Sequence, residues 1–172
     1  PHVFFLVVVF FSMISYADFE PVNLDLLPEH QTKSSIATSR KTGIGIDFGS
    51  GKTPSIGLSI KHWISSHQAF QLHFGPRNIN RDIFSQASYL FHLHQLAYSH
   101  AFEIFWFAGP GIFYGFDNEF DDHAVGALAD IGLNLHFLEM PIDVSIELAP
   151  TLQLSSSIGL YLTANFAMRY YF

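Results

Sequence analysis

The chain has 172 residues, the length of one domain, and only 13% of them are charged, against about 25% in an average globular protein. Apolar residues make up 49% and aromatic residues 16%, which excludes a disordered chain. With 8 Lys+Arg against 15 Asp+Glu, a net charge of −7 and no cysteine, the sequence offers no basic surface for nucleic acid, no disulfide framework and no Cys-based zinc site.

Residues 1–17 are predicted to be a signal peptide. Val3 to Phe11 is an unbroken apolar run of suitable length, and Ser15 and Ala17 supply the small residues that a cleavage site needs. The alternative is a buried core helix or strand. The run is too short for a membrane-spanning helix, which needs about 20 apolar residues, and no other apolar stretch is long enough. Residues 18–41 are polar and show no period, so we interpret them as a leader before a domain at 42–172.

From Gly43 onward, apolar residues recur with a period of two, which is typical of strands that have two unlike faces. The pattern is clearest in the segments 125–137, 142–149 and 158–172. Shorter or noisier runs predict five further strands at 44–48, 56–61, 70–74, 87–94 and 102–114. The sequence therefore predicts eight strands.

The predicted connections alternate in length. Turns are expected at 65–68, 95–100 and 138–141, and mostly longer loops at 49–55, 76–86, 115–123 and 155–157. Short periplasmic turns and longer external loops are typical of transmembrane barrels. Four acidic residues gather in the loop predicted at 115–123.

The composition of the two faces separates a membrane barrel from a soluble one. In most runs one face carries almost no charge, whereas the other is rich in Gly, Ser, Ala, Thr and Asn with isolated ions. A soluble, lipocalin-like barrel would need Lys and Glu on its outer face. Small residues with a few paired ions suit the interior of a narrow barrel, and the apolar face suits lipid. We therefore expect an all-β, eight-stranded antiparallel up-and-down transmembrane β-barrel.

The C-terminal residues carry the most specific pattern. Phe172 ends the chain, and Phe166, Met168 and Tyr170 share its face. This resembles the C-terminal assembly signature of bacterial outer-membrane barrels. With Gly57-Leu58-Ser59-Ile60-Lys61-His62-Trp63 and Ile146-Glu147-Leu148-Ala149-Pro150, the chain is similar to an uncharacterised group of small eight-stranded OmpA-like barrels. The resemblance implies the fold and a bacterial outer-membrane location, but no activity.

We expect a network of ionisable residues inside the barrel, because buried charges must be paired. Its predicted members are Asp47, Lys61, Glu103, Asp130, Asp143, Glu147 and Arg169. If the last hairpin turns at 155–157, Asp143 lies opposite Arg169 and the two form an ion pair. Glu103 is expected to approach His92 or His94.

Chemical activity has weaker support. Asp143 and Glu147 could act as an acid/base pair, but a structural salt-bridge network is the preferred interpretation. His92 and His94 share a strand face with no third converging ligand, so we predict no metal site, no cofactor and no enzyme. Phe105 and Phe107 are expected to fill the interior. Aromatic residues near the strand ends are interpreted as interfacial girdles; they are Trp63, Tyr89, Tyr98, Trp106, Tyr114, Tyr170 and Phe172.

The favoured hypothesis is a structural or surface-interaction barrel with a filled lumen. Its expected partners are outer-membrane lipids, the barrel-assembly machinery through the C-terminal strand, and an extracellular partner through the loops, but no nucleic acid. The alternatives are a narrow channel, a lipid-modifying enzyme, or a secreted soluble barrel or sandwich that binds an apolar ligand.

Overall fold

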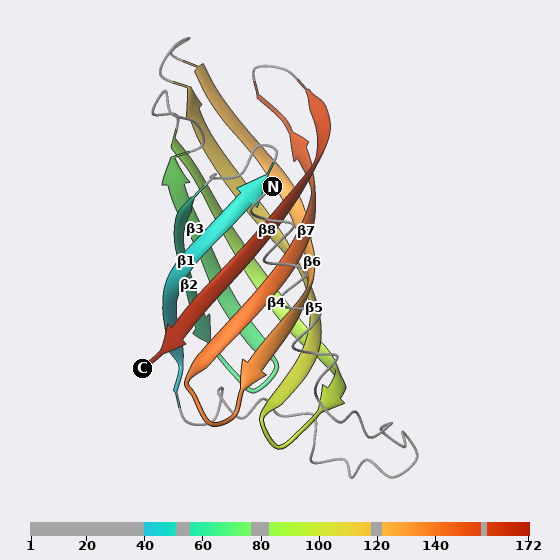
Figure 1. Ribbon diagram of the computed structural model, residues 1–172. Coiled ribbons are helices and arrows are strands. Elements are labelled where there is room, and N and C mark those ends of the chain that lie inside the picture. The colour runs from blue at the N-terminus through green and yellow to red at the C-terminus, as the bar shows by residue number, and fades with distance from the viewer. Residues whose placement is uncertain (1–39, 51–55, 77–82, 118–121, 156–157) are drawn as a thin grey trace.

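The computed structural model describes residues 40–50, 56–76, 83–117, 122–155 and 158–172 (Figure 1). The predicted signal peptide, and the predicted leader except for Arg40 and Lys41, lie outside the described residues. Within the described part of the chain there is no helix that is both long and apolar enough to cross a membrane.

Eight antiparallel strands form one closed barrel in which each strand pairs with its neighbours in sequence, and β1 pairs with β8 to close the sheet (Figure 1). The strands are β1 (Thr42–Ser50), β2 (Gly57–Trp63), β3 (Gln68–Pro76), β4 (Ile83–Tyr98), β5 (Phe102–Asp117), β6 (Asp122–Phe137), β7 (Ile142–Gln153) and β8 (Gly159–Tyr171). The predicted fold, all-β with eight antiparallel strands, is confirmed.

The two ends of the barrel differ in their connections. The short β2–β3, β4–β5 and β6–β7 turns lie at the same end as Phe172, which we call the turn end (Figure 1). The strand ends at Ser50, Pro76, Asp117 and Gln153 lie at the opposite end, called the loop end. Several strands are longer than predicted: β4 spans 83–98 instead of 87–94, and the predicted turn at 95–100 contracts to 99–101. A bulge in β4 between His92 and Ala97 interrupts the alternation of inward and outward residues. The period-two pattern therefore does not show that the strand continues beyond the bulge.

The described side chains are sorted by charge between the two faces of the sheet. Leu133, Leu160 and Leu162 are 46%, 76% and 67% exposed, whereas Asp130 and Arg169 are 0% and 1% exposed. Outward-facing residues on all eight strands are mostly apolar, and none of those described is Asp, Glu, Lys or Arg. The hydrophobic surface therefore lies outside the barrel and the ionic groups lie inside.

Glycine allows close approach at the β1–β8 seam. A Cβ atom on Gly45 would overlap the backbone carbonyl of Met168 and the Cα of Arg169. Gly45 lies directly across from Arg169, so this glycine brings the closing strands together beside the polar interior.

Candidate functional site

The candidate site is the barrel interior, where the structure places all seven ionisable residues that the sequence singled out. Glu103 is 3% exposed, Arg169 is 1% exposed, and the other five are fully buried. Each comes from an inward position of a strand, as alternation requires. They are Asp47 on β1, Lys61 on β2, Glu103 on β5, Asp130 on β6, Asp143 and Glu147 on β7, and Arg169 on β8.

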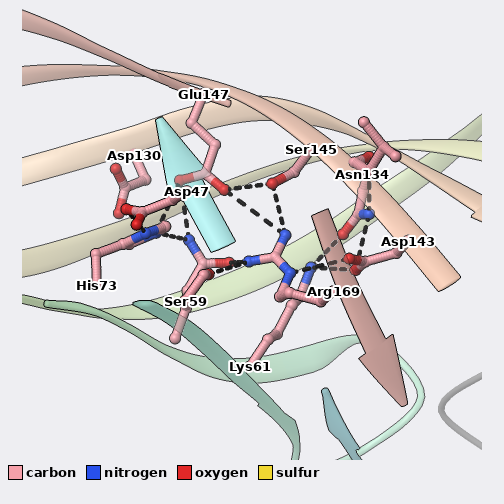
Figure 2. Close-up of polar contacts among 12 residues, drawn as sticks. Asp47, Ser59, Lys61, His73, Asp130, Asn134, Asp143, Ser145, Glu147 and Arg169 are labelled. Carbon is pink, nitrogen blue, oxygen red and sulfur yellow. Dashed lines mark hydrogen bonds and ion pairs between the residues drawn. The ribbon is translucent and has the colours of Figure 1, made fainter. Parts of the chain in front are cut away.

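Arg169 is the centre of the network (Figure 2). Its Nε donates to Asp143 Oδ1 at 2.9 Å, and the two residues are directly paired in the β7–β8 register. Its Nη1 donates across the lumen to Ser59 Oγ at 3.0 Å and to Gln71 Oε1 at 2.7 Å, while Nη2 donates to Ser145 Oγ at 2.5 Å. One guanidinium therefore ties β8 to β7, β2 and β3.

Asp143 accepts hydrogen bonds from three directions. Besides Arg169, its Oδ2 accepts from the Tyr171 hydroxyl at 2.8 Å and from Asn134 Nδ2 at 3.1 Å. The Nζ of Lys61 lies 4.0 Å from the same oxygen. A buried carboxylate is costly unless it is paired and hydrogen-bonded, and Asp143 meets both conditions.

Lys61 occupies a mixed environment of polar atoms and rings. Its Nζ donates to Asn134 Oδ1 and lies 2.9 Å from His92 Nε2. The ammonium also lies 5.0 Å from the ring centre of Trp63 and 5.2 Å from that of Phe107, within the range of cation–π attraction. Lys61 therefore has partners on β2, β4, β5 and β6.

Glu147 and His73 extend the network toward the loop end. Glu147 accepts from Ser145 Oγ at 2.7 Å and from Gln71 Nε2 at 2.9 Å, and its Oε2 lies 3.3 Å from His73 Nε2. The other ring nitrogen of His73 lies 2.7 Å from Asp47 Oδ2. A chain of contacts thus runs from β1 through β3 to β7.

The remaining two carboxylates lie at the edges of the network. Asp130 accepts from Gln86 Nε2, with both oxygens at 3.0 Å. Glu103 Oε1 lies 3.4 Å from His136 Nδ1, its register partner on β6. The prediction that Glu103 approaches His92 or His94 is wrong in register, because the extension of β4 places Tyr98 opposite Glu103 and His92 opposite Phe107.

Apolar side chains lie inside the barrel on both sides of this polar layer. Toward the loop end, the rings of Phe84 and Phe113 stack with centres 5.6 Å apart and pack with Leu128 and Ala149. Toward the turn end, Trp63, Ala69 and Tyr171 form a second buried cluster. An eight-stranded barrel has an interior about wide enough for side chains, and the described side chains form three layers there.

The position of Trp63 differs from the prediction. It was predicted as an interfacial girdle residue, but it is 1% exposed and its ring lies 4.3 Å from that of His92 inside the barrel. Its inward direction follows from sharing a face with Ser59 and Lys61. The small Ala69 is its register partner on β3, which leaves space for the indole.

The network holds more acid than base. Among the seven predicted residues, five have carboxyl groups and two, Lys61 and Arg169, have basic side chains. Among the residues that the structure describes, no group of three or more His, Asp or Glu side chains is arranged to hold a metal ion. The arrangement is that of a cross-linked core.

The predicted assembly residues lie on the outer face of β8. Met168, Tyr170 and Phe172 are 45%, 48% and 68% exposed, and Phe166 is half-buried. The rings of Tyr170 and Phe172 meet edge to face at 5.2 Å, and the Phe172 amide donates to the Thr42 carbonyl at 2.9 Å. The end of the chain is therefore bonded to β1 and presents an aromatic edge outward.

Sequence reasoning missed the neutral members of the network. Gln71, Asn134, Ser145 and Tyr171 supply hydrogen bonds to Arg169, Asp143, Lys61 or Glu147. Alternation placed each of them on the inward face, but their side chains are uncharged, so they were not predicted to take part in an ionic network.

Fold and interior together define a small closed antiparallel barrel of eight strands with a polar, cross-linked core. The crystal structure of the N-terminal beta-barrel domain of Pseudomonas aeruginosa OprF has this fold: it superimposes with a TM-score of 0.57 at 14% sequence identity, over 77% of this chain and 98% of that domain. The predicted similarity to small eight-stranded barrels is thus confirmed for the fold. No protein-family model and no curated protein matches the sequence.

Proposed function

We propose that this chain is a bacterial outer-membrane β-barrel of the structural or surface-interaction type, without catalytic activity. The proposal rests on one observation: apolar side chains lie on the outer face of the sheet and the ionic side chains lie on its inner face. A mostly apolar outer face on which no described outward strand residue is Asp, Glu, Lys or Arg suits hydrocarbon, and a closed barrel leaves no unpaired strand edge in lipid. In water the same exterior would be a very large exposed apolar surface.

The filled lumen supports a structural role over transport. Arg169 reaches from β8 to β2 and β3 across the interior, and the Phe84–Phe113 stack lies between this layer and the loop end. We expect the purified protein to give no ion conductance in planar bilayers. A reproducible conductance would instead favour the narrow channel.

The proposed partners follow from the exposed parts. Outer-membrane lipids would cover the barrel wall, and the outward aromatic edge at Tyr170 and Phe172 would be recognised by the barrel-assembly machinery. Loops at the loop end, above all the acidic segment predicted at 115–123, would meet an extracellular partner.

Two measurements test the location directly. After cell fractionation, the protein should stay in the outer-membrane pellet and should migrate differently on gels with and without heating. Release into the periplasmic extract would favour a secreted soluble barrel.

A separate experiment tests the absence of catalytic activity. Variants Glu103→Gln, Asp143→Asn and Glu147→Gln should leave the lipid A composition of the cell unchanged; a changed profile in a folded variant would favour a lipid-modifying enzyme.

A further inference from the structure

His73 lies between two carboxylates inside the barrel (Figure 2). The residue is 1% exposed on β3. Its Nδ1 lies 2.7 Å from Asp47 Oδ2 on β1, and its Nε2 lies 3.3 Å from Glu147 Oε2 on β7. His92 is also buried, but its Nε2 lies 2.9 Å from Nζ of Lys61. These two histidines therefore face groups of opposite charge.

The charge of the His73 ring decides how many of its contacts are hydrogen bonds. A neutral imidazole has one donor and one acceptor, whereas an imidazolium donates from both nitrogens. Because an ionised carboxylate only accepts, a neutral ring can donate to Asp47 or to Glu147 but not to both. Burial disfavours a charge on the ring, and two charge-assisted hydrogen bonds at these distances offset that cost.

Gln71 is placed to serve either form of the ring. Its Oε1 accepts from Arg169 Nη1 at 2.7 Å, which leaves Nε2 as the donor. This Nε2 lies 2.7 Å from His73 Nε2 and 2.9 Å from Glu147 Oε2. Because those two atoms are only 3.3 Å apart, one N–H of the amide points to one or the other. It donates to His73 when the ring is neutral, and to Glu147 when the ring is an imidazolium.

Charged side chains surround His73 from four other strands, and three of the four are acidic. Asp130 is connected to it through Gln86, which donates to Asp130 and lies opposite His73 in the β3–β4 register. On β2 the residue opposite His73 is the uncharged Ser59, and on β5 the residue opposite Gln86 is the apolar Phe113. The charged groups are Asp47 on β1, Asp130 on β6, Glu147 on β7 and Arg169 on β8.

We propose that His73 is a proton-dependent cross-link of the lumen. As an imidazolium it donates to Asp47 and Glu147 at once and ties β1 and β7 to β3. Loss of one proton breaks the bond to Glu147 and turns the Gln71 amide toward the ring, which leaves Ser145 as the hydrogen-bond donor to that carboxylate. The part of the network toward the loop end is then held less firmly. The cross-link acts in the interior, so it does not depend on the proposed membrane location.

Urea unfolding of the full refolded chain between pH 6 and pH 10 tests the proposal. An unfolded histidine titrates near pH 6.5, so a cross-link that needs the proton stabilises the barrel below that pH and is lost as the pH rises. Relative to His73→Gln, the folding equilibrium constant of the unaltered protein should fall by about tenfold or more over this range. His92→Gln is the matched control, since His92 faces Lys61, and its pH dependence should parallel that of the unaltered protein.

Nitrogen-15 NMR of the histidine rings gives a second readout, which a merely structural role would not move. The His73 signals, assigned by their loss in His73→Gln, should show both ring nitrogens protonated at pH 7. Glu147→Gln removes one acceptor charge and should shift the loss of the proton to lower pH. A neutral ring at pH 7, or parallel pH curves for the unaltered protein and His73→Gln, would overturn the proposal. If His73→Gln does not fold, His73→Asn takes its place in both measurements with the same expected results.

Discussion

Arg169 and Asp143 lie directly opposite each other on β8 and β7, and their side chains meet at 2.9 Å inside the barrel. No other described Lys or Arg side chain in this interior lies within hydrogen-bond distance of a carboxylate. The pair therefore anchors the polar layer inside the barrel.

Replacing Arg169 by Met should strongly destabilise the barrel. The change leaves Asp143 and Glu147 buried without their guanidinium partner, which costs about 3–5 kcal/mol when one member of a buried pair is removed. Urea unfolding in lipid vesicles measures the loss. The double variant Arg169→Met with Asp143→Leu should lose less than the sum of the single changes, and Lys41→Gln, on an exposed residue, should have no measurable effect. Strict additivity would contradict the account.

The two adjacent tyrosines at the end of β8 give a matched comparison. Tyr171 is fully buried and its hydroxyl donates to Asp143, whereas Tyr170 is 48% exposed on the outer face. Tyr171→Phe should lower the free energy of unfolding by about 1.5–3 kcal/mol, because a hydrogen bond to a charged group is lost. Tyr170→Phe should change it by less than about 0.5 kcal/mol. Equal effects of the two changes would show that the Asp143 bond contributes little.

Charge on the outer wall should be costly in a bilayer. Leu133 lies within β6, away from both of its ends, and is 46% exposed, so Leu133→Arg should cost about 2–4 kcal/mol of folding free energy in vesicles. Leu154, just beyond β7 at the loop end, is the control, and Leu154→Arg should cost no more than about 1 kcal/mol. A neutral or stabilising effect of Leu133→Arg would indicate a wall that faces water.

Close approach at the β1–β8 seam should make Gly45 intolerant of a side chain. Gly45→Ala would place a methyl group on backbone atoms of Met168 and Arg169, which cannot move aside as a side chain could, so we expect a loss of about 1–3 kcal/mol. Gly115→Ala is the control, since its added carbon would meet the Ala124 Cβ at an ordinary 3.6 Å. Comparable stability of the two variants in urea unfolding would contradict the seam geometry.

The success of the sequence interpretation depended on how regular each strand is. The Asp143–Arg169 pairing followed from alternation on β7 and β8 and from the position of one short connection, and the register confirms it. The predicted register of Glu103 was wrong because the bulge shifts the β4–β5 register and β4 continues beyond it, whereas the broken alternation was interpreted as the end of the strand.

Other features depended on size and on packing between strands. Trp63 faces inward by alternation with Ser59 and Lys61, and the small Ala69 opposite it leaves room for its ring, a relation that requires the β2–β3 register. The hollow of about 510 Å³ on the outer wall is likewise lined by residues of five strands, β2 to β6, and no single strand reveals it. Alternation thus assigns the face of a residue, while its contacts need the register of the neighbouring strands.

The central claim is that the apolar face lies in hydrocarbon and the polar face in the lumen. The two tryptophans test it most directly, because Trp63 is buried inside the barrel and Trp106 alternates with the inward Phe105 and Phe107 and so faces out. In vesicles of lipids brominated along the acyl chain, Trp63→Phe, which retains Trp106, should lose most of its fluorescence, whereas Trp106→Phe, which retains Trp63, should be quenched only weakly. Strong quenching of Trp63 together with an unquenched Trp106 would contradict the account.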